Sequence, residues 1–394
     1  MKALEGIRVI DLTQAMAAPF CTMNLADMGA DVIKIEPPGT GEPTRQLGAV
    51  QQNGHSATFM TMNRDKRGLT VNLKHPEGVA IIKRLARTAD VLVQNYRPGV
   101  VEGMGLGYEA LRPLNPRLIY CSVSGFGATG PYASRGGYDL IAQGMSGIIS
   151  VTGDEDGPPA KAGIPLSDLA AGLFAAYGIL CALEYRERTG EGQFVDTSLL
   201  EAALALTVWE STEHWVTGRV PRPLGSAHRL SAPYQAIRAQ DGSFTVGANS
   251  DKLFEGFCRA IGRPDLLDDS RFNGRTQRLD NRAQLIPEIE KTTITEPRAH
   301  WLERLDEAGV PSGPINTYAE ALGDPQALAR DMVVDLMHPG AGPIKALGIP
   351  VKLSATPGAV DRPAPLLGQH TAEILTELGY SETDQRELED KGVI

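Results

Sequence analysis

The sequence predicts an α/β protein with a parallel sheet and a second, smaller α+β domain. Near the N-terminus, a strand at Ile7–Leu12, a helix at Pro19–Met28 and a strand at Asp31–Ile35 make a β-α-β unit. Such units place parallel strands side by side through right-handed crossovers. Later in the chain, Asp241-Gly242 stands between two strand-like segments, Tyr234–Arg238 and Ser243–Gly247, which is typical of a β-hairpin.

The α/β pattern continues between these two regions and returns at the end of the chain. Residues 217–233 repeat Gly, Pro and Arg and predict a linker. We therefore expect the first part of a large domain at 1–216 and a small α+β domain at 234–325, a typical domain size. The further elements that we expect are strands at Leu69–Leu73, Val91–Gln94, Leu118–Val123 and Gln193–Thr197, and helices at Pro76–Thr88, Leu199–Val216 and Thr371–Leu388, the last interrupted near Gly379.

Composition narrows the classes of function. The chain has 394 residues and a formal net charge of −10, and no basic segment with interleaved aromatic residues offsets that charge, so we expect no nucleic-acid partner. The four cysteines are far apart and read as reduced core residues, and the seven histidines never fall at metal-ligand spacing, so no metal site is predicted. We see no secretory leader and no apolar run long enough to span a bilayer, which indicates a cytoplasmic protein without a membrane partner.

One carboxylate, Asp168, stands at the start of a long apolar helix. The run Leu169–Leu183 carries no charge, so we expect this helix to be buried all round in a large core. Pro165 and Ser167 are typical of a helix start, and an acidic residue in the first turn faces the positive end of the helix dipole, which favours its ionised form. Asp168 is then either a helix cap or an anionic nucleophile in an apolar wall. Position alone favours the cap.

Other motifs point to a ligand site at strand ends. Gly125–Gly130 matches G-x-G-x-x-G, but Pro131 and the glycines that follow keep the chain irregular, so we reject a dinucleotide site. Polar groups follow several strands, where open α/β sheets bind ligands. Phosphate ligands could come from Arg64, Lys66, Arg67 and Lys74, with Tyr96 stacking on a base, although each cation taken singly is more often solvated.

A set of ordered segments resembles the class III coenzyme A transferase family, also called the CaiB/BaiF family. The match covers nearly the whole chain and is carried by Leu4–Leu12, Gly29–Glu36, Asn63–Arg67, Asn95–Gly99, Asn115–Ile119, Gly125–Gly127, Gly137–Asp139, Leu166–Asp168, Thr189–Gln193 and Pro365–His370. The resemblance implies a Rossmann-like large domain built from both chain ends, with 326–394 as return linker and C-terminal part, a small domain, and a homodimer of two interlocked protomers.

The resemblance also implies a chemistry. The aspartate that matches Asp168 would be the nucleophile, attacking an acyl-CoA to give a mixed anhydride and then an aspartyl-CoA thioester. Coenzyme A or its thioester would be a substrate, with no prosthetic group. Gly225-Ser-Ala-His228 stands near the family's mobile glycine loop, but it has one glycine where formyl-CoA transferase has several.

Only some of the CoA-binding residues of formyl-CoA transferase are matched in this sequence. Met16 and Ala17 match a Gln-Ala pair of formyl-CoA transferase, and Pro38 and Gly103 stand where that enzyme has CoA-binding arginines. The phosphate contacts would then come from other cations. The CoA-binding residues that we expect are Met16, Ala17, Arg64, Arg67, Asn72, Leu73, Lys74, Asn95, Tyr96, Arg97 and Met104.

Two alternatives stay open beside a CoA transferase. Family racemases pair their aspartate with a histidine in a Gly-His-Asp triplet, whereas this chain has Tyr138 at that place. A non-catalytic CoA-binding protein is the other, since fold alone does not guarantee activity. The segment from Gly225 looks more like succinyl-CoA-dependent transferases that act on dicarboxylates. His228 and Arg229 would pair with a distal carboxylate or be solvated linker residues.

Overall fold

The computed structural model describes residues 1–48 and 50–394 and divides into two compact units. The first unit comprises Met1–Ile149, Lys161–Val220 and Pro325–Ile394, so both ends of the chain contribute to it. The second comprises Ser150–Ala160 and Pro221–Asp324. We expected residues 1–216 to belong to the large domain, but Ser150–Ala160 groups with the second unit. Within that unit the Gly225 N–H donates a hydrogen bond to the Gly153 carbonyl (2.9 Å).

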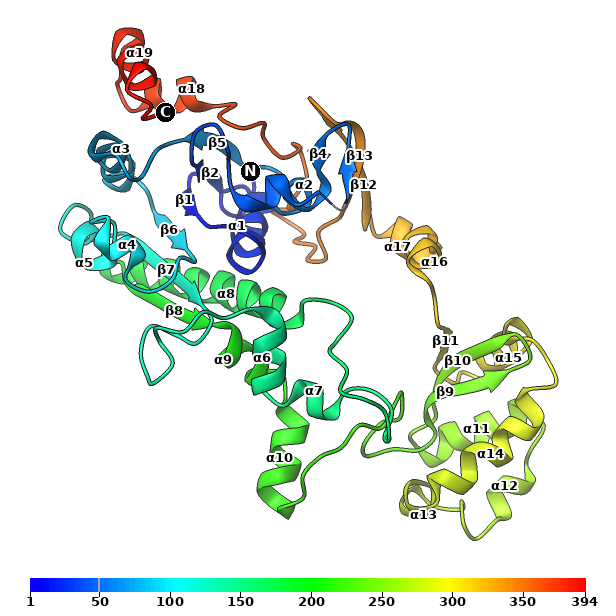
Figure 1. Ribbon diagram of the computed structural model, residues 1–394. Helices are drawn as coiled ribbons and strands as arrows, with labels where there is room; N and C mark the ends of the chain where they lie inside the picture. Colours follow the sequence, from blue (N-terminus) through cyan, green and yellow to red (C-terminus); the bar gives the residue numbers. More distant parts are fainter. Residues whose placement is uncertain (49) are drawn as a thin grey trace. The chain divides into compact units, whose positions relative to one another are not determined.

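A parallel sheet of six strands forms the centre of the first unit (Figure 1). Its order is β5-β2-β1-β6-β7-β8, and each neighbouring pair is parallel, with Val9 of β1 opposite Val32 on one side and Val91 on the other. The predicted α/β class with a parallel sheet is confirmed. The strands are β1 Arg8–Leu12, β2 Asp31–Glu36, β5 Arg67–Thr70, β6 Val91–Gln94, β7 Ile119–Ser124 and β8 Phe194–Ser198.

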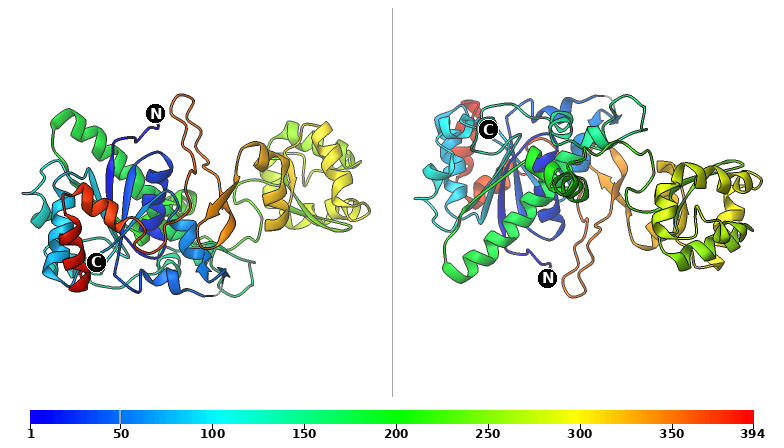
Figure 2. Two further views of the ribbon diagram at one scale, coloured as in Figure 1. Left: turned by 90° about the horizontal axis from the view of Figure 1, so that it is seen from above. Right: turned by 90° about the horizontal axis from the view of Figure 1, so that it is seen from below.

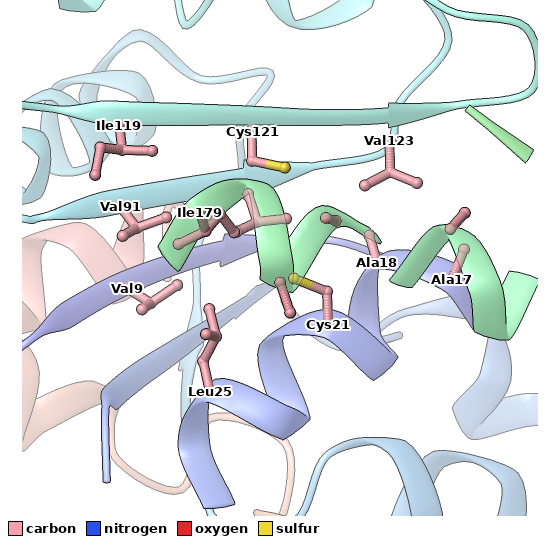
Figure 3. Close-up of a cluster of buried hydrophobic side chains, with 14 of the residues drawn as sticks. Val9, Ala17, Ala18, Cys21, Leu25, Val91, Ile119, Cys121, Val123 and Ile179 are labelled. Carbon is pink, nitrogen blue, oxygen red and sulfur yellow. The ribbon is translucent and has the colours of Figure 1, made fainter. Parts of the chain in front are cut away.

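Helices cover both faces of this sheet. On one face, α1 (Ala17–Asp27) and α8 (Leu166–Thr189) pack against the strands, and side chains such as Val91, Ile119 and Ile179 meet in a cluster of buried residues (Figure 3). On the other face, α3 (Pro76–Ala86) and α18 (Thr371–Glu377) bury a second apolar cluster. The four inner strands, β2, β1, β6 and β7, thus send residues into both cores, as in doubly covered parallel sheets.

One predicted helix is divided in the structure. The single helix expected at Leu199–Val216 is two helices, because the chain breaks at Leu206 and Thr207. The predicted interruption near Gly379 is present. The other elements of the first unit are η1 Pro43–Gln46, β3 Gln51–Gln52, β4 His55–Ser56, α2 Ala57–Met62, α4 Val100–Gly103, α5 Tyr108–Leu111, α6 Asp139–Met145, α9 Leu199–Ala205, α10 Val208–Thr217, α17 Pro325–Ala329, β12 Val333–His338, β13 Gly342–Leu347 and α19 Glu382–Asp390, and α7 Ile148–Val151 bridges the boundary.

Helix α8 is buried on one side only, which corrects the expectation of burial all round. Figure 2 shows it as the long green helix beside the blue strands. Its small residues face the sheet, while Leu173, Phe174, Tyr177, Leu180 and Cys181 are exposed. We expected no apolar segment long enough to span a bilayer, but α8 is long and apolar enough to do so. Half of its most apolar 18-residue stretch is buried inside the protein, as in the core helix of a globular protein.

The second unit is a small α+β domain around a three-stranded sheet of order β11-β10-β9. The hairpin predicted at Asp241-Gly242 is present, with Ser243 opposite Arg238. Phe244, Phe254, Phe257 and Trp301 lie in its apolar core. Its elements are β9 Tyr234–Ala239, β10 Gly242–Gly247, α11 Asp251–Ala260, α12 Asp265–Asp268, α13 Arg275–Asp280, α14 Arg282–Thr293, α15 Arg298–Glu307, β11 Ser312–Pro314 and α16 Tyr318–Gly323.

We expect Gly172→Ala to lower the free energy of unfolding by about 1–3 kcal/mol. A Cβ atom at Gly172 of α8 would lie 2.5 Å from the Ala17 carbonyl oxygen at the start of α1, so the two helices must separate. Gly144→Ala is the matched control, because a Cβ at that helical glycine meets its nearest neighbour only at 3.8 Å and Ala favours helix. Urea unfolding of both variants measures the effect; equal stability of the two would contradict it.

Candidate functional site

A cavity of about 540 Å³ opens at the carboxyl ends of β1, β6, β7 and β8, within the first unit. This is the edge at which parallel sheets bind ligands. The loops that follow β1, β6 and β7 supply most of its wall, and Asp168 reaches it from α8. The lining residues are Gln14, Ala15, Met16, Ala17, Pro43, Leu47, Asn95, Tyr96, Arg97, Pro98, Val123, Ser124, Gly125, Arg135, Gly136, Gly137, Tyr138, Asp168 and Leu199.

Asp168 lies in the first turn of α8 but does not cap the helix. The carboxylate that caps it belongs to Asp139, whose Oδ1 accepts a hydrogen bond from the Ser167 N–H (2.9 Å) and whose Oδ2 accepts one from Gln143 (2.7 Å). Among the residues that the structure describes, none donates a hydrogen bond to the Asp168 carboxylate. The cap interpretation of Asp168 is therefore wrong, because another acid already fills that place.

The environment of Asp168 raises its pKa to about 6. Burial is the larger cause, and the nearby negative charge of Asp139 adds to it. This corrects the sequence-based expectation that the helix dipole favours the ionised form, since the positive helix end is already used by Asp139. A carboxylate with a raised pKa binds a proton, or attacks an electrophile, more readily than an ordinary one. A cavity carboxyl with such a pKa is a candidate for a functional group.

Several predicted residues gather in this cavity with Asp168. Met16, Ala17, Asn95, Tyr96, Arg97 and Tyr138 all line it. The Asn95 amide is committed to the protein, because its oxygen accepts from the Gln14 N–H (2.9 Å) and its nitrogen donates to the Gln14 carbonyl (2.8 Å). Its side chain therefore fixes the neighbouring loop.

Two arginines, Arg97 and Arg135, line the same cavity. Within the described part of the chain, neither forms an ion pair. The Arg135 guanidinium lies over the rings of Tyr132 (4.6 Å) and Phe126 (5.4 Å), which hold it in place. Arginines without a carboxylate partner at a cavity are suited to bind phosphate or carboxylate. Sequence reasoning missed Arg135, although its position in the irregular loop after the Leu118–Val123 strand was a usable signal.

Arg64 and Arg67 are not in the cavity, which corrects their expected role as phosphate ligands. Both are buried. Arg64 pairs with Asp27 (2.6 Å), and Arg67 pairs with Asp31 (2.7 Å) and with two glutamates of α18, Glu373 and Glu377. Their guanidinium groups join parts of the fold, so they have no free face for a ligand.

Four other predicted residues lie outside the cavity lining. Leu73 and Met104 pack against the apolar cluster on the α3 face of the sheet. Asn72 accepts a hydrogen bond from the Lys74 N–H (3.1 Å) and donates to the Gly392 carbonyl (3.3 Å), and Lys74 is exposed. Their part in CoA binding stays a prediction.

Of the predicted substrate-loop residues, Tyr138 belongs to the first unit, whereas Gly225, His228 and Arg229 belong to the second. Gly225 has φ 58°, a left-handed conformation that glycine adopts freely. The His228 N–H donates to the Tyr234 carbonyl (2.9 Å), and the Arg229 guanidinium donates to the Arg222 carbonyl (3.0 Å). Their contact with a substrate stays a prediction.

Comparison with known proteins decides the family. The model of CoA-transferase family III matches residues 4–371. The chain belongs to this family. Succinyl-CoA:glutarate CoA-transferase of Mus musculus is 41% identical over 395 residues, 100% of this chain and 91% of that protein. Succinyl-CoA--D-citramalate CoA-transferase of Chloroflexus aurantiacus is also 41% identical, over 100% of this chain and 98% of its own.

A solved structure agrees with this assignment. The crystal structure of a CAIB/BAIF family protein from Brucella suis superimposes with a TM-score of 0.86 at 37% identity, covering 96% of this chain and 99% of that one. The transferase predicted from the sequence resemblance is thereby confirmed as an enzyme of the CoA-transferase class. Over residues 1–48 and 50–394, no group of three or more His, Cys, Asp or Glu side chains could hold a metal ion.

The raised pKa of Asp168 predicts a pH-dependent effect of Asp168→Asn on stability. The folded-state pKa of about 6 exceeds the ordinary 3.8, so ionisation destabilises the folded protein progressively between these two pH values, fully above pH 6 and only slightly near pH 4. We expect Asp168→Asn to melt at a higher temperature than the wild type at pH ~8 and at a nearly equal temperature at pH ~4.

Differential scanning calorimetry checks this expectation. Asp335→Asn, at an exposed carboxylate on β12, is the control and should leave the melting temperature unchanged at both pH values. A difference for Asp168→Asn that is the same at pH ~4 and pH ~8 would show that burial does not perturb this carboxyl.

Proposed function

We propose that this CoA transferase moves CoA from succinyl-CoA to a second dicarboxylic acid by covalent catalysis at Asp168. The observation that carries the proposal is the half-buried Asp168 carboxyl, with a pKa of about 6, in a cavity that also exposes two arginines without carboxylate partners. The names of the curated relatives support the substrates, because those proteins use succinyl-CoA with glutarate or D-citramalate.

The reaction balances as four attacks at acyl carbons. A carboxylate oxygen of Asp168 attacks the thioester carbonyl of succinyl-CoA, and the C–S bond breaks to give a succinyl-aspartyl anhydride and CoA thiolate. The thiolate attacks the aspartyl carbonyl of the anhydride, which releases succinate and leaves an aspartyl-CoA thioester. The acceptor carboxylate then displaces the thiolate to form a new anhydride. The thiolate finally attacks its acceptor acyl carbon, which regenerates the Asp168 carboxylate.

Groups of this cavity fit the charges of that sequence. Both substrates and every leaving group are anionic, so Arg97 and Arg135 favour binding of a phosphate or of a distal carboxylate. Gly125 and Gly137 pack backbone to backbone, since a Cβ on Gly125 would lie 2.7 Å from the Gly137 Cα. Backbone N–H groups of these loops are the candidates to stabilise the oxyanion of each tetrahedral intermediate. Exclusion of water protects the anhydride from hydrolysis.

The racemase alternative lacks support in the cavity. A racemase needs a second base across the α-carbon from its aspartate. Tyr138 lines the cavity at the place of the family's histidine, and no histidine is among the lining residues that the structure describes. The raised pKa of Asp168 suits a nucleophile as well as a base and does not distinguish the two reactions. The lack of a second base among the lining residues that the structure describes is what disfavours a racemase.

The nucleophile proposal predicts that Asp168→Asn loses transfer by at least about a thousandfold while it still binds CoA. Mass spectrometry of the CoA products, after incubation of succinyl-CoA with a mixture of organic acids, measures donor and acceptor together. Wild-type protein should yield dicarboxyl-CoA products, and Asp335→Asn should match it. Near-normal turnover by Asp168→Asn would reject the covalent mechanism, and a wild type that uses only monocarboxyl-CoA donors would reject the substrate class.

We also propose that the enzyme is a cytoplasmic homodimer whose protomers interlock. An apolar face of α8 supports the dimer: Leu173 is 53% exposed, Tyr177 66% and Leu180 45%. Helix α10, which has no buried residue, adds the exposed rings of Trp209 and Trp215. Contiguous apolar surface of this kind is typical of an oligomer interface. Cysteines that are all free thiols support a reducing compartment.

Charge on the apolar face of α8 should therefore break the dimer. We expect Leu173→Asp with Leu180→Asp to shift the mass in multi-angle light scattering from dimer to monomer, because two carboxylates would be buried without partners. Arg386→Asp, at an exposed position of α19, is the control and should stay dimeric. A wild-type protein that is monomeric at micromolar concentration would contradict the dimer, as would a double variant that remains dimeric.

A further inference from the structure

The loop between β1 and α1 together with the first residue of α1, which we name the pocket strap (Thr13–Ala17), is held in a conformation that its sequence does not favour. Four of its five residues line the cavity. Ala15 has φ 65°, the left-handed region, which a residue with a Cβ rarely adopts. Because the strap contains no glycine, contacts from outside must hold this conformation.

Side chains from four separate segments bind the strap backbone. Asp11 accepts from the Thr13 N–H (2.9 Å), and Lys34 donates to the Thr13 carbonyl. Asn95 binds both backbone groups of Gln14. Glu42 accepts from the Ala15 N–H (2.9 Å) at the strained residue itself. The backbone N–H of three consecutive strap residues is thus fixed by a carboxylate or an amide.

The charged members of this set belong to a buried cluster. Asp11, Lys34, Lys66 and Glu42 are each at most 3% exposed, and the two carboxylates balance the two ammonium groups. Lys66 pairs with Asp11 (2.9 Å). Buried ion pairs seldom stabilise a fold more than apolar residues of the same volume would, because desolvation offsets the attraction. Stability alone is therefore a weak reason for four buried charges at this point.

The pocket strap is also in direct contact with the helix that carries Asp168. Gly172 lies one turn after Asp168 in α8, and it approaches so closely that a Cβ there would be 2.5 Å from the Ala17 carbonyl oxygen. The end of the strap and the first turns of α8 therefore form one wall of the cavity. A shift of the strap changes the position of a bound thioester relative to the Asp168 carboxylate.

We propose that Glu42 is a positioning residue of the transfer reaction. By binding the Ala15 N–H it fixes the pocket strap, which aligns the thioester with Asp168 and keeps water from the acyl intermediates. Glu42 does not line the cavity and does not touch the reacting atoms. The inference rests on the proposed role of Asp168. Misplacement of a substrate by about 1 Å can lower a rate by about a hundredfold, so small displacements of the strap are sufficient.

Two conservative variants separate positioning from stability. Glu42→Gln keeps an oxygen for the Ala15 N–H but removes a charge from the buried cluster, so it should be less stable yet keep kcat/KM within about threefold of wild type. Glu42→Asp keeps the charge but retracts the acceptor by one methylene, so it should fold stably and lose kcat/KM by at least about tenfold. Glu42→Ala should lose both.

The partition between transfer and hydrolysis is the second readout. Succinyl-CoA is supplied with glutarate, and the ratio of free CoA to glutaryl-CoA is measured. We expect this ratio to rise at least about fivefold in Glu42→Asp and to stay near the wild-type value in Glu42→Gln, since a displaced wall admits water. Asp65→Ala is the matched control: Asp65 is a buried carboxylate that accepts from the backbone N–H of Asp361 (3.1 Å) and Arg362 (2.8 Å), outside the cavity. It should lose stability without changing kcat/KM or the ratio.

Two results would overturn the proposal: wild-type kcat/KM and partition in Glu42→Asp, or equal losses in Glu42→Gln and Glu42→Ala. Asp168→Asn, assayed in parallel, keeps the two proposals distinct. If Asp168→Asn is active, the covalent mechanism fails whatever the Glu42 variants do. If Asp168→Asn is inactive and Glu42→Asp is normal, only the role of Glu42 fails.

Discussion

The buried carboxylate of Asp11 is the interaction on which the site geometry depends. It lies near the end of the central strand β1 and is surrounded by the ammonium groups of Lys34 and Lys66. Burial alone would raise its pKa, but these two charges and hydrogen bonds from Thr13 and Thr22 hold the pKa well below its usual range. Asp11 is therefore ionised at neutral pH. Because Lys34 is within β2 and Lys66 directly precedes β5, one carboxylate near the end of β1 is tied to the middle of β2 and to the start of β5.

Asp168 shows that an acidic residue in the first turn of a helix does not always bind the free backbone N–H groups of that turn. The N–H groups there would normally lower the pKa of a first-turn acid. Asp139 accepts from the Ser167 N–H instead, so that its own charge adds to the effect of burial on Asp168. In the proposed mechanism this raised pKa has two opposite effects: a more basic carboxylate attacks a thioester more readily, but a smaller fraction of the molecules carries it ionised in acid.

The sequence predicted what depends on local pattern and could not predict what depends on distant contacts. Strand and helix periodicity placed β1, β2, β6 and β7 within a residue or two, and the order of motifs identified the family. The sequence could not show that Arg97 lines the cavity whereas Arg64 is buried in an ion pair, because both are arginines beside loops. Only the tertiary position of Asp27 shows that the charge of Arg64 is neutralised inside the fold. The breadth of the α8 core was overestimated for a similar reason. An apolar helix that packs on a sheet and one that also faces a second protomer have the same composition.

Construction of the first unit from both ends of the chain has a consequence for synthesis on the ribosome. All six strands of the sheet are present once β8 has emerged, but one face is then only partly covered by α3, since α18 buries Ile374 and Leu375 against it only after residues 221–324 have been made. The edge strand β5 also waits for that segment, because Gly68 and Thr70 hydrogen-bond to His370 and Thr371. The nascent chain thus carries a partly uncovered apolar sheet face while residues 221–324 of the second unit are made, and exposed apolar surface of this kind favours aggregation during folding.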